Sequence, residues 1–153
     1  MHSLDTFDAI DKSIKINLTA PILITNKISK LMIQKQKGLI IFFSSVAVAV
    51  NQLGSSTYSA SKSGIETFSK NICNELKKFN IKIGTIRILY IPTKLSNKLN
   101  RKEIKNLRTK FKTNKFNNVK KIFNKINEIY NQKNVVTNNV FFDNKKPKNK
   151  KYE

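Results

Sequence analysis

The stretch that decides the fold is residues 38–72, GLIIFFSSVAVAVNQLGSSTYSASKSGIETFSKNI. Residues 39–43 are a short run of β-branched and aromatic side chains that ends at two serines, which indicates a buried strand. After Tyr58, apolar residues recur at steps of three and four, at Ile65, Phe68, Ile72, Leu76 and Phe79. This spacing predicts a helix with one buried face. A buried strand followed by such a helix indicates an α/β fold.

Three polar side chains are expected to meet at one end of this unit. Tyr58 and Lys62 are four residues apart, so both lie on one side of the helix near its start. Ser45 lies at the carboxyl end of the strand, where open α/β sheets place their ligand crevice. An ammonium group one turn away favours the phenolate form of a tyrosine, and a serine hydroxyl could hydrogen-bond a carbonyl oxygen. This trio fits proton transfer in carbonyl reduction, for which a cofactor has to supply the hydride.

These residues resemble the active-site region of the short-chain dehydrogenase/reductase family. Its Tyr-x-x-x-Lys motif is matched by Tyr58 and Lys62, and its catalytic serine, 13 positions before the tyrosine, falls on Ser45. The motif alone is common, but strand, serine and tyrosine in register make it specific. The resemblance implies a Rossmann-type doubly wound parallel sheet, an NAD or NADP cofactor bound in part by Tyr58 and Lys62, and hydride transfer to or from a small carbonyl or alcohol substrate.

Residues 4–32 predict one long helical segment with a break at Pro21, because proline cannot donate to the carbonyl four residues back, that of Asn17. In the family, an asparagine 28 positions before the catalytic serine lies in a kinked helix, and that position is Asn17 here. The resemblance implies that the Asn17 carbonyl, with Lys62, holds a water that relays protons to Tyr58. The alternative is that Asn17 only caps or kinks the helix.

The rest of the chain supplies further expected elements. Residues 82–88 and 135–142 are predicted to be strands, parallel to and beside residues 39–43. Residues 101–130 predict two basic amphipathic helices, and residues 46–57 a loop.

Two residues after the second predicted strand resemble cofactor ligands. By resemblance, Ile91 and Thr93 match the positions that contact the nicotinamide carboxamide, although Ile88 and Leu89 replace the Pro-Gly pair of the family.

The resemblance covers only the catalytic part of the family. No Gly-x-x-x-Gly-x-Gly sequence follows a strand, so the phosphate-binding loop and the first βαβ half are absent from this chain. We therefore expect a partial, truncated Rossmann-type domain at residues 1–143 with an open sheet edge, and a basic disordered tail at residues 144–153. Two functions compete: an NAD(P)-dependent oxidoreductase whose activity as this chain alone is in doubt, and a catalytically inactive remnant that acts as an interaction or oligomerisation module.

The formal net charge of +21 is the compositional feature that bears most on partners. The lysines accompany abundant asparagine and isoleucine, as an AT-rich coding sequence would produce, and no nucleic-acid module is visible, so nucleic acid is not an expected partner. A membrane-surface helix would resemble residues 101–130, though nothing else in the sequence supports one. The family resemblance implies a homo-oligomer formed through helices at residues 10–33 and 58–79.

The cysteine and histidine content excludes some kinds of site. Cys73 and His2 are each the only residue of their type, which leaves no pair for a disulfide and no ligand set for zinc. With no signal peptide and no long apolar run in view, we expect a cytoplasmic protein without a metal site.

Overall fold

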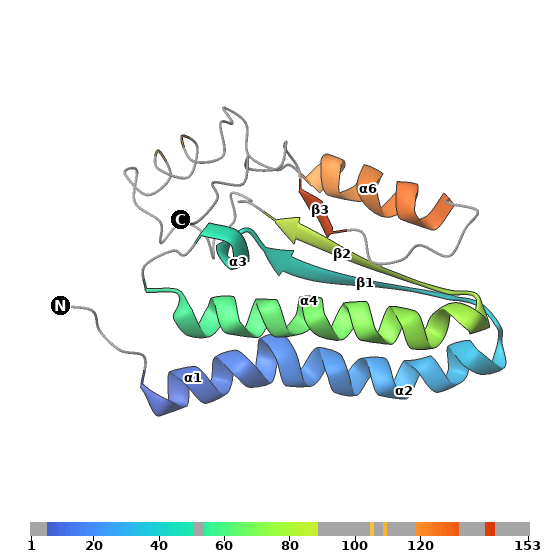
Figure 1. Ribbon diagram of the computed structural model, residues 1–153, viewed down its shortest axis with the longest axis horizontal. Coiled ribbons are helices and arrows are strands. Elements are labelled where there is room, and N and C mark those ends of the chain that lie inside the picture. Colours follow the sequence, from blue (N-terminus) through green and yellow to red (C-terminus); the bar gives the residue numbers. More distant parts are fainter. Residues whose placement is uncertain are drawn as a thin grey trace, which may run out of the picture.

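The computed structural model describes residues 6–50, 54–88, 105, 109, 119–131 and 140–142. In chain order its elements are α1 (Phe7–Ile14), the π-helix η1 (Lys15–Thr19), α2 (Ala20–Gln34), β1 (Gly38–Ser45), α3 (Ala47–Val50), α4 (Ser56–Leu76), the 3-10 turn η2 (Lys77–Phe79), β2 (Ile81–Ile88), α6 (Val119–Asn131) and β3 (Val140–Phe142). They form an α/β arrangement in which α4 lies between the sheet and the α1–α2 segment (Figure 1).

The sheet is parallel throughout the described chain, as the sequence predicts. β1 pairs with β2 over its full length, from Gly38 opposite Ile81 to Ser45 opposite Ile88. β2 pairs on its other side with β3, which gives the strand order β1-β2-β3. Of the predicted third strand, only 140–142 falls within the described residues. In this part of the chain β1 is an edge strand, so its outer main-chain groups have no strand partner.

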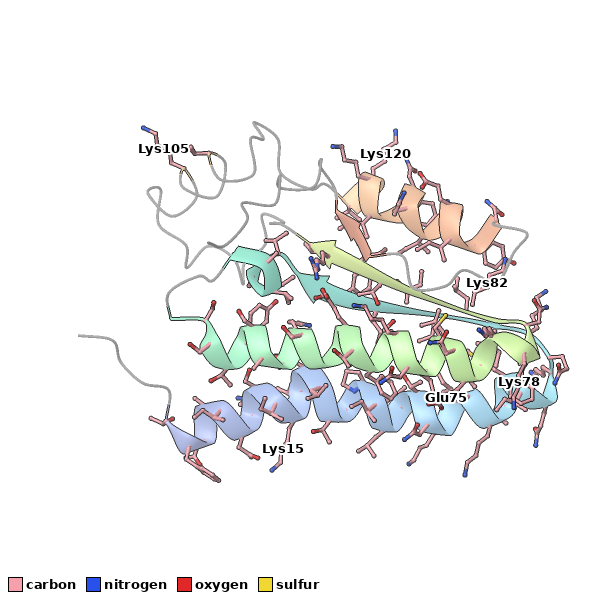
Figure 2. All side chains as sticks on the ribbon, in the orientation of Figure 1. Lys15, Glu75, Lys78, Lys82, Lys105 and Lys120 are labelled. Atoms are coloured by element: carbon pink, nitrogen blue, oxygen red, sulfur yellow. The ribbon has the colours of Figure 1, made fainter. Side chains whose placement is uncertain are left out.

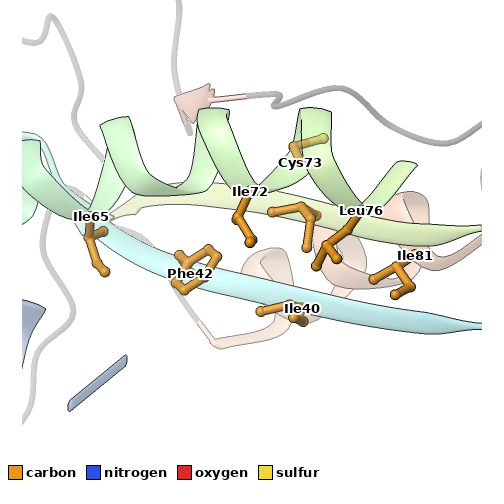
Figure 3. Packing of buried hydrophobic residues seen from close by; sticks show 8 residues of the cluster. Ile40, Phe42, Ile65, Ile72, Cys73, Leu76 and Ile81 are labelled. Atoms are coloured by element: carbon orange, nitrogen blue, oxygen red, sulfur yellow. The ribbon is translucent and has the colours of Figure 1, made fainter. Parts of the chain in front are cut away.

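The main core lies between α4 and one face of the sheet. Ile40 and Phe42 of β1 pack with Ile65, Ile72 and Leu76 of α4, and all five are buried (Figure 3). Removing a side chain of this size from water contributes roughly 1.5–3 kcal/mol. The helical spacing therefore identified the buried face of α4 correctly.

A second, smaller core covers the opposite face of the sheet. Ile129 of α6 is fully buried there against Ile86, and Leu39 and Ile41 of β1 border the contact. Gly84 makes the close approach possible, because a Cβ at this position would lie 3.1 Å from Cδ1 of Ile129. α6 confirms the second of the two predicted basic helices, whereas the first falls almost entirely outside the described residues.

The N-terminal helical segment continues through residues 7–34 without ending at Pro21, which corrects the predicted break. The turn before the proline widens instead: the N–H of Ala20 bonds to the carbonyl of Lys15, five residues back. Proline has no N–H to give to the carbonyl of Asn17, and a π-type turn lets the helix absorb that missing bond.

The expected loop at residues 46–57 also contains structure that the sequence did not predict. Residues Ala47–Val50 form the short helix α3, and the hydroxyl of Ser45 accepts a hydrogen bond from the amide of Ala47 at 3.2 Å. A side-chain oxygen at this place satisfies one of the amides that a helix start leaves open.

Most of the basic residues that the structure describes are exposed. Figure 2 shows the side chains of Lys15 and Lys120 pointing away from the sheet. No helix in the described part of the chain combines the length and apolar character needed to cross a bilayer.

Candidate active site

The first turns of α4 bring Tyr58 and Lys62 together, as their spacing predicts. The helix begins at Ser56, which places Tyr58 in its first turn. Tyr58 is 39% exposed, so the residue lies at the surface. The amine of Lys62 lies 5.8 Å from the centre of the Tyr58 ring. A cation at this distance interacts favourably with the ring and stands within one helical turn of the phenol.

Lys62 also ties α4 to the end of β1. Its Nζ donates a hydrogen bond to the main-chain carbonyl of Phe43 at 3.1 Å. Desolvation by burial lowers the pKa of Lys62 from its ordinary value of 10.5. The amine is therefore held at a defined place, two residues before Ser45.

Ser45 is the last residue of β1 and is half-buried. On its far side, the hydroxyl of Ser59 donates to the carbonyl of Ala47 at 3.2 Å. Contacts from α4 thus bracket Ser45, at Phe43 before it and at Ala47 after it. The serine and the Tyr58–Lys62 turn consequently lie at the same end of the sheet, its carboxyl end.

Asn17 lies in η1, the π-type turn that packs against α4. The neighbouring Leu18 fills the space beside Gly64, where a Cβ would come within 3.0 Å of its Cδ1. The side-chain amide of Asn17 donates to Ser13 at 3.5 Å. Because Pro21 has no N–H, the Asn17 carbonyl lacks its α-helical donor, and its role toward Lys62 stays a prediction. Ile91 and Thr93 lie outside the described residues.

A charged pair under this site was not predicted from the sequence. The carboxylate of Glu66 on α4 accepts hydrogen bonds from Nε and an Nη of Arg87 on β2, both at 2.5 Å. It also accepts one from the hydroxyl of Ser44 at 2.6 Å. The available signal was Glu66 beside Ile65 on the buried face of the helix and Arg87 inside a predicted buried strand, because buried charges need a partner.

A further polar contact between α4 and the sheet lies one turn beyond Glu66. The hydroxyl of Thr85 on β2 donates to that of Ser69 at 2.7 Å, and both residues are fully buried. Beyond it the interface becomes apolar, with Ile72, Cys73 and Leu76. The polar half of α4 therefore faces the carboxyl ends of the strands, where the candidate site lies.

Comparison with known proteins relates this chain to short chain dehydrogenases. A family model described as short chain dehydrogenase matches residues 1–104. The chain is 36% identical over 93 residues to "Nodulation protein G" of Rhizobium meliloti, covering 61% of this chain and 38% of that protein. It is 34% identical over 91 residues to a "3-oxoacyl-[acyl-carrier-protein] reductase" of Synechocystis sp., covering 60% and 37%.

A solved structure shares the fold. This is the bulky-bulky ketone specific alcohol dehydrogenase of Comamonas testosteroni, with a TM-score of 0.54 and 24% sequence identity over 56% of this chain and 36% of that one. The chain therefore spans less than two fifths of the length of these three proteins.

Proposed function

The chain belongs to the short-chain dehydrogenase family, and from this premise we propose that it carries the acid/base half of an NAD(P)-dependent oxidoreductase acting on a small carbonyl or alcohol. The observation that carries the proposal is the placement of Tyr58 and Lys62 on successive turns of α4, tied to β1 on both sides of Ser45. Proton transfer to a carbonyl oxygen needs this combination of acid, nearby cation and fixed hydroxyl.

Each side chain has a distinct role in the proposed reaction. Tyr58 gives its proton to the carbonyl oxygen during reduction and takes it back during oxidation. Ser45 donates a hydrogen bond to the same oxygen. Lys62 stabilises the phenolate; an ammonium has three donors, and only one is used by Phe43. The Asn17 carbonyl, which Pro21 deprives of its α-helical donor, would hold a water on the proton path to Lys62.

The residues present fit one end of the cofactor. Nicotinamide supplies the hydride, and Tyr58, Lys62, Ile91 and Thr93 would hold the nicotinamide and its ribose. Among the described residues no glycine-rich loop is available for the phosphates. Gly38 faces Met32, Gly64 faces Leu18, Gly84 faces Ile129, and Gly54 stands in a turn. Phosphate binding would need a glycine-rich turn supplied outside this sequence.

Self-association through α1, α2 and α4 is part of the proposal. Besides Phe7 at its start, four large apolar residues of the α1–α2 segment are more than half exposed, namely Ile16, Leu23, Ile24 and Leu31. Their spacing of seven and eight residues puts them on one side of the helix. Such a stripe favours helix packing against a second copy. It equally supports the second candidate function, an inactive remnant that serves as an interaction module. A reducing compartment, the cytoplasm, fits Cys73, the buried free thiol.

The test joins the nucleotide-binding half of a family member to this chain and measures ketone reduction beside NADPH fluorescence titration. We expect the unmodified chain to bind NADPH weakly and the fusion to turn over. Tyr58→Phe should lower turnover at least about 100-fold with little change in cofactor binding, because it removes the transferable proton. Tyr130→Phe makes the same change at an exposed position on α6 and should leave turnover unchanged. Normal turnover by the Tyr58→Phe fusion would contradict the proposal.

A further inference from the structure

Glu66 joins three elements directly below the candidate site. It lies on α4, four residues after Lys62 and thus one turn further along the helix. Its carboxylate binds Ser44 at the end of β1 and Arg87 at the end of β2. Ser44 and Arg87 are themselves neighbours in the sheet register. One carboxylate therefore fixes the two strand ends and the helix relative to one another.

Stability alone gives a weak reason for such a pair. The side chain of Glu66 is 6% exposed and that of Arg87 is 16% exposed, so both charges are largely removed from water. The cost of desolvating two charges cancels much of their attraction, and apolar residues of similar volume often serve as well. What the pair adds is geometry, because a guanidinium that binds a carboxylate through two parallel N–H groups is fixed in direction as well as in distance.

We propose that Glu66 and Arg87 are a positioning pair for the Tyr58–Lys62 turn, holding the half-buried Lys62 in its place between Tyr58 and the end of β1. This inference rests on the proposed function of that turn. Ser44, which precedes Ser45, is fixed by the same carboxylate. Loss of the pair should release the amine of Lys62 from Phe43 toward solvent while the apolar half of α4 keeps the fold.

The test is an NMR titration of the Lys62 side chain in the full chain, using lysine labelled with 13C at Cε and Lys62→Arg for assignment. In the unmodified protein the pKa of Lys62 should lie below 10.5 because of burial. The double variant Glu66→Gln/Arg87→Met removes one charge of each sign and keeps similar volumes. We expect most of the lowering of the Lys62 pKa to disappear. Arg87→Lys keeps the positive charge but cannot bind the carboxylate of Glu66 through two parallel N–H groups, and should give an intermediate Lys62 pKa.

The controls separate positioning from general electrostatics and from folding. The pair Lys125 and Glu128 on α6 allows the matched variant Lys125→Met/Glu128→Gln, which should leave the Lys62 pKa unchanged. The other elements packed against α4 carry charged groups that stay the same in all variants: Asp8, Asp11, Lys12, Lys15, Lys27, Lys30, Lys77, Lys78 and Lys82.

Three results would overturn the inference. The first is a Lys62 pKa that stays lowered in the double variant while the thermal midpoint falls, because the pair would then be structural only. The second is an ordinary Lys62 pKa in the unmodified chain. If the double variant does not fold, Ser44→Ala serves in its place, because it removes only the hydrogen bond to Glu66 and should raise the Lys62 pKa by a smaller amount. The third overturning result is an unchanged Lys62 pKa in Ser44→Ala. A moved Lys62 pKa combined with an inactive fusion would refute the proposed function and leave the positioning pair standing.

Discussion

The packing of α6 on the sheet leads to a prediction about Gly84 and Ile129. In Gly84→Ala the new Cβ would lie 3.1 Å from Cδ1 of Ile129, and such overpacking costs about 1–3 kcal/mol. Replacing a glycine within a strand by alanine stabilises the folded state by about 0.5–1 kcal/mol, so we expect Gly84→Ala to lower the free energy of unfolding by about 1 kcal/mol overall. Ile129→Val alone removes Cδ1 and should cost about 0.5–1.5 kcal/mol.

The double variant Gly84→Ala/Ile129→Val tests whether the two residues are in contact. Without Cδ1, the nearest atom of residue 129 to the new Cβ is Cγ2 at 3.5 Å, an ordinary contact. Gly84→Ala should therefore become neutral or stabilising in the Ile129→Val background, which gives a coupling energy of about 1 kcal/mol.

Urea unfolding of the four proteins, followed by circular dichroism, measures this coupling from the midpoints at constant slope. The control Val119→Ala changes an exposed residue of the same helix and should stay within about 0.5 kcal/mol of the unmodified protein. Additive losses in the cycle would refute the docking of α6 over Gly84.

Three further predictions concern α4 and the N-terminal helices. Because burial lowers the pKa of Lys62, the unfolded chain binds more protons than the folded one between that pKa and 10.5. The free energy of unfolding should therefore rise with pH across this window. Urea midpoints measured at several pH values should show this rise, and Lys62→Met should remove it. Thr85→Val leaves the buried hydroxyl of Ser69 without its partner and should lower the free energy of unfolding by about 1–3 kcal/mol. Ser69→Ala should cost much less in the Thr85→Val background than in the unmodified protein. Equal costs of Ser69→Ala in the two backgrounds would contradict the contact. Leu23→Asp with Leu31→Asp should convert a sedimenting oligomer to monomer, and an unmodified chain that is monomeric at all concentrations would show the proposed interface to be wrong.

Sequence patterns predicted what depends on neighbours along the chain. The strand positions β1 and β2 and the buried face of α4 follow from apolar spacing, which local geometry translates directly into one buried side. Tyr58 and Lys62 could be paired for the same reason, since four residues make one helical turn. Pro21 marked the right place for a helical irregularity, although the missing donor produced a π-type turn and not a break.

What the sequence missed depends on packing between distant elements. The bond from Lys62 to the carbonyl of Phe43 and the pair of Glu66 with Arg87 join residues about twenty positions apart, and no periodicity encodes which element faces which. The helix α3 was missed because its start relies on the hydroxyl of Ser45, a residue assigned only to chemistry. The family likeness supplied roles for these residues but none of these contacts.

The change of character along α4 implies two different regimes of local opening within one helix. Toward its carboxyl end, Ile72, Cys73 and Leu76 pack on the fully buried Ile81 and Ile83, so amide hydrogens there should exchange only through global unfolding. Toward its start, the helix is held by hydrogen bonds at the rim of the sheet, each worth only about 1 kcal/mol net. The turns around Tyr58 should therefore exchange through low-energy fluctuations. One end of α4 can therefore open locally while the other end keeps the domain folded.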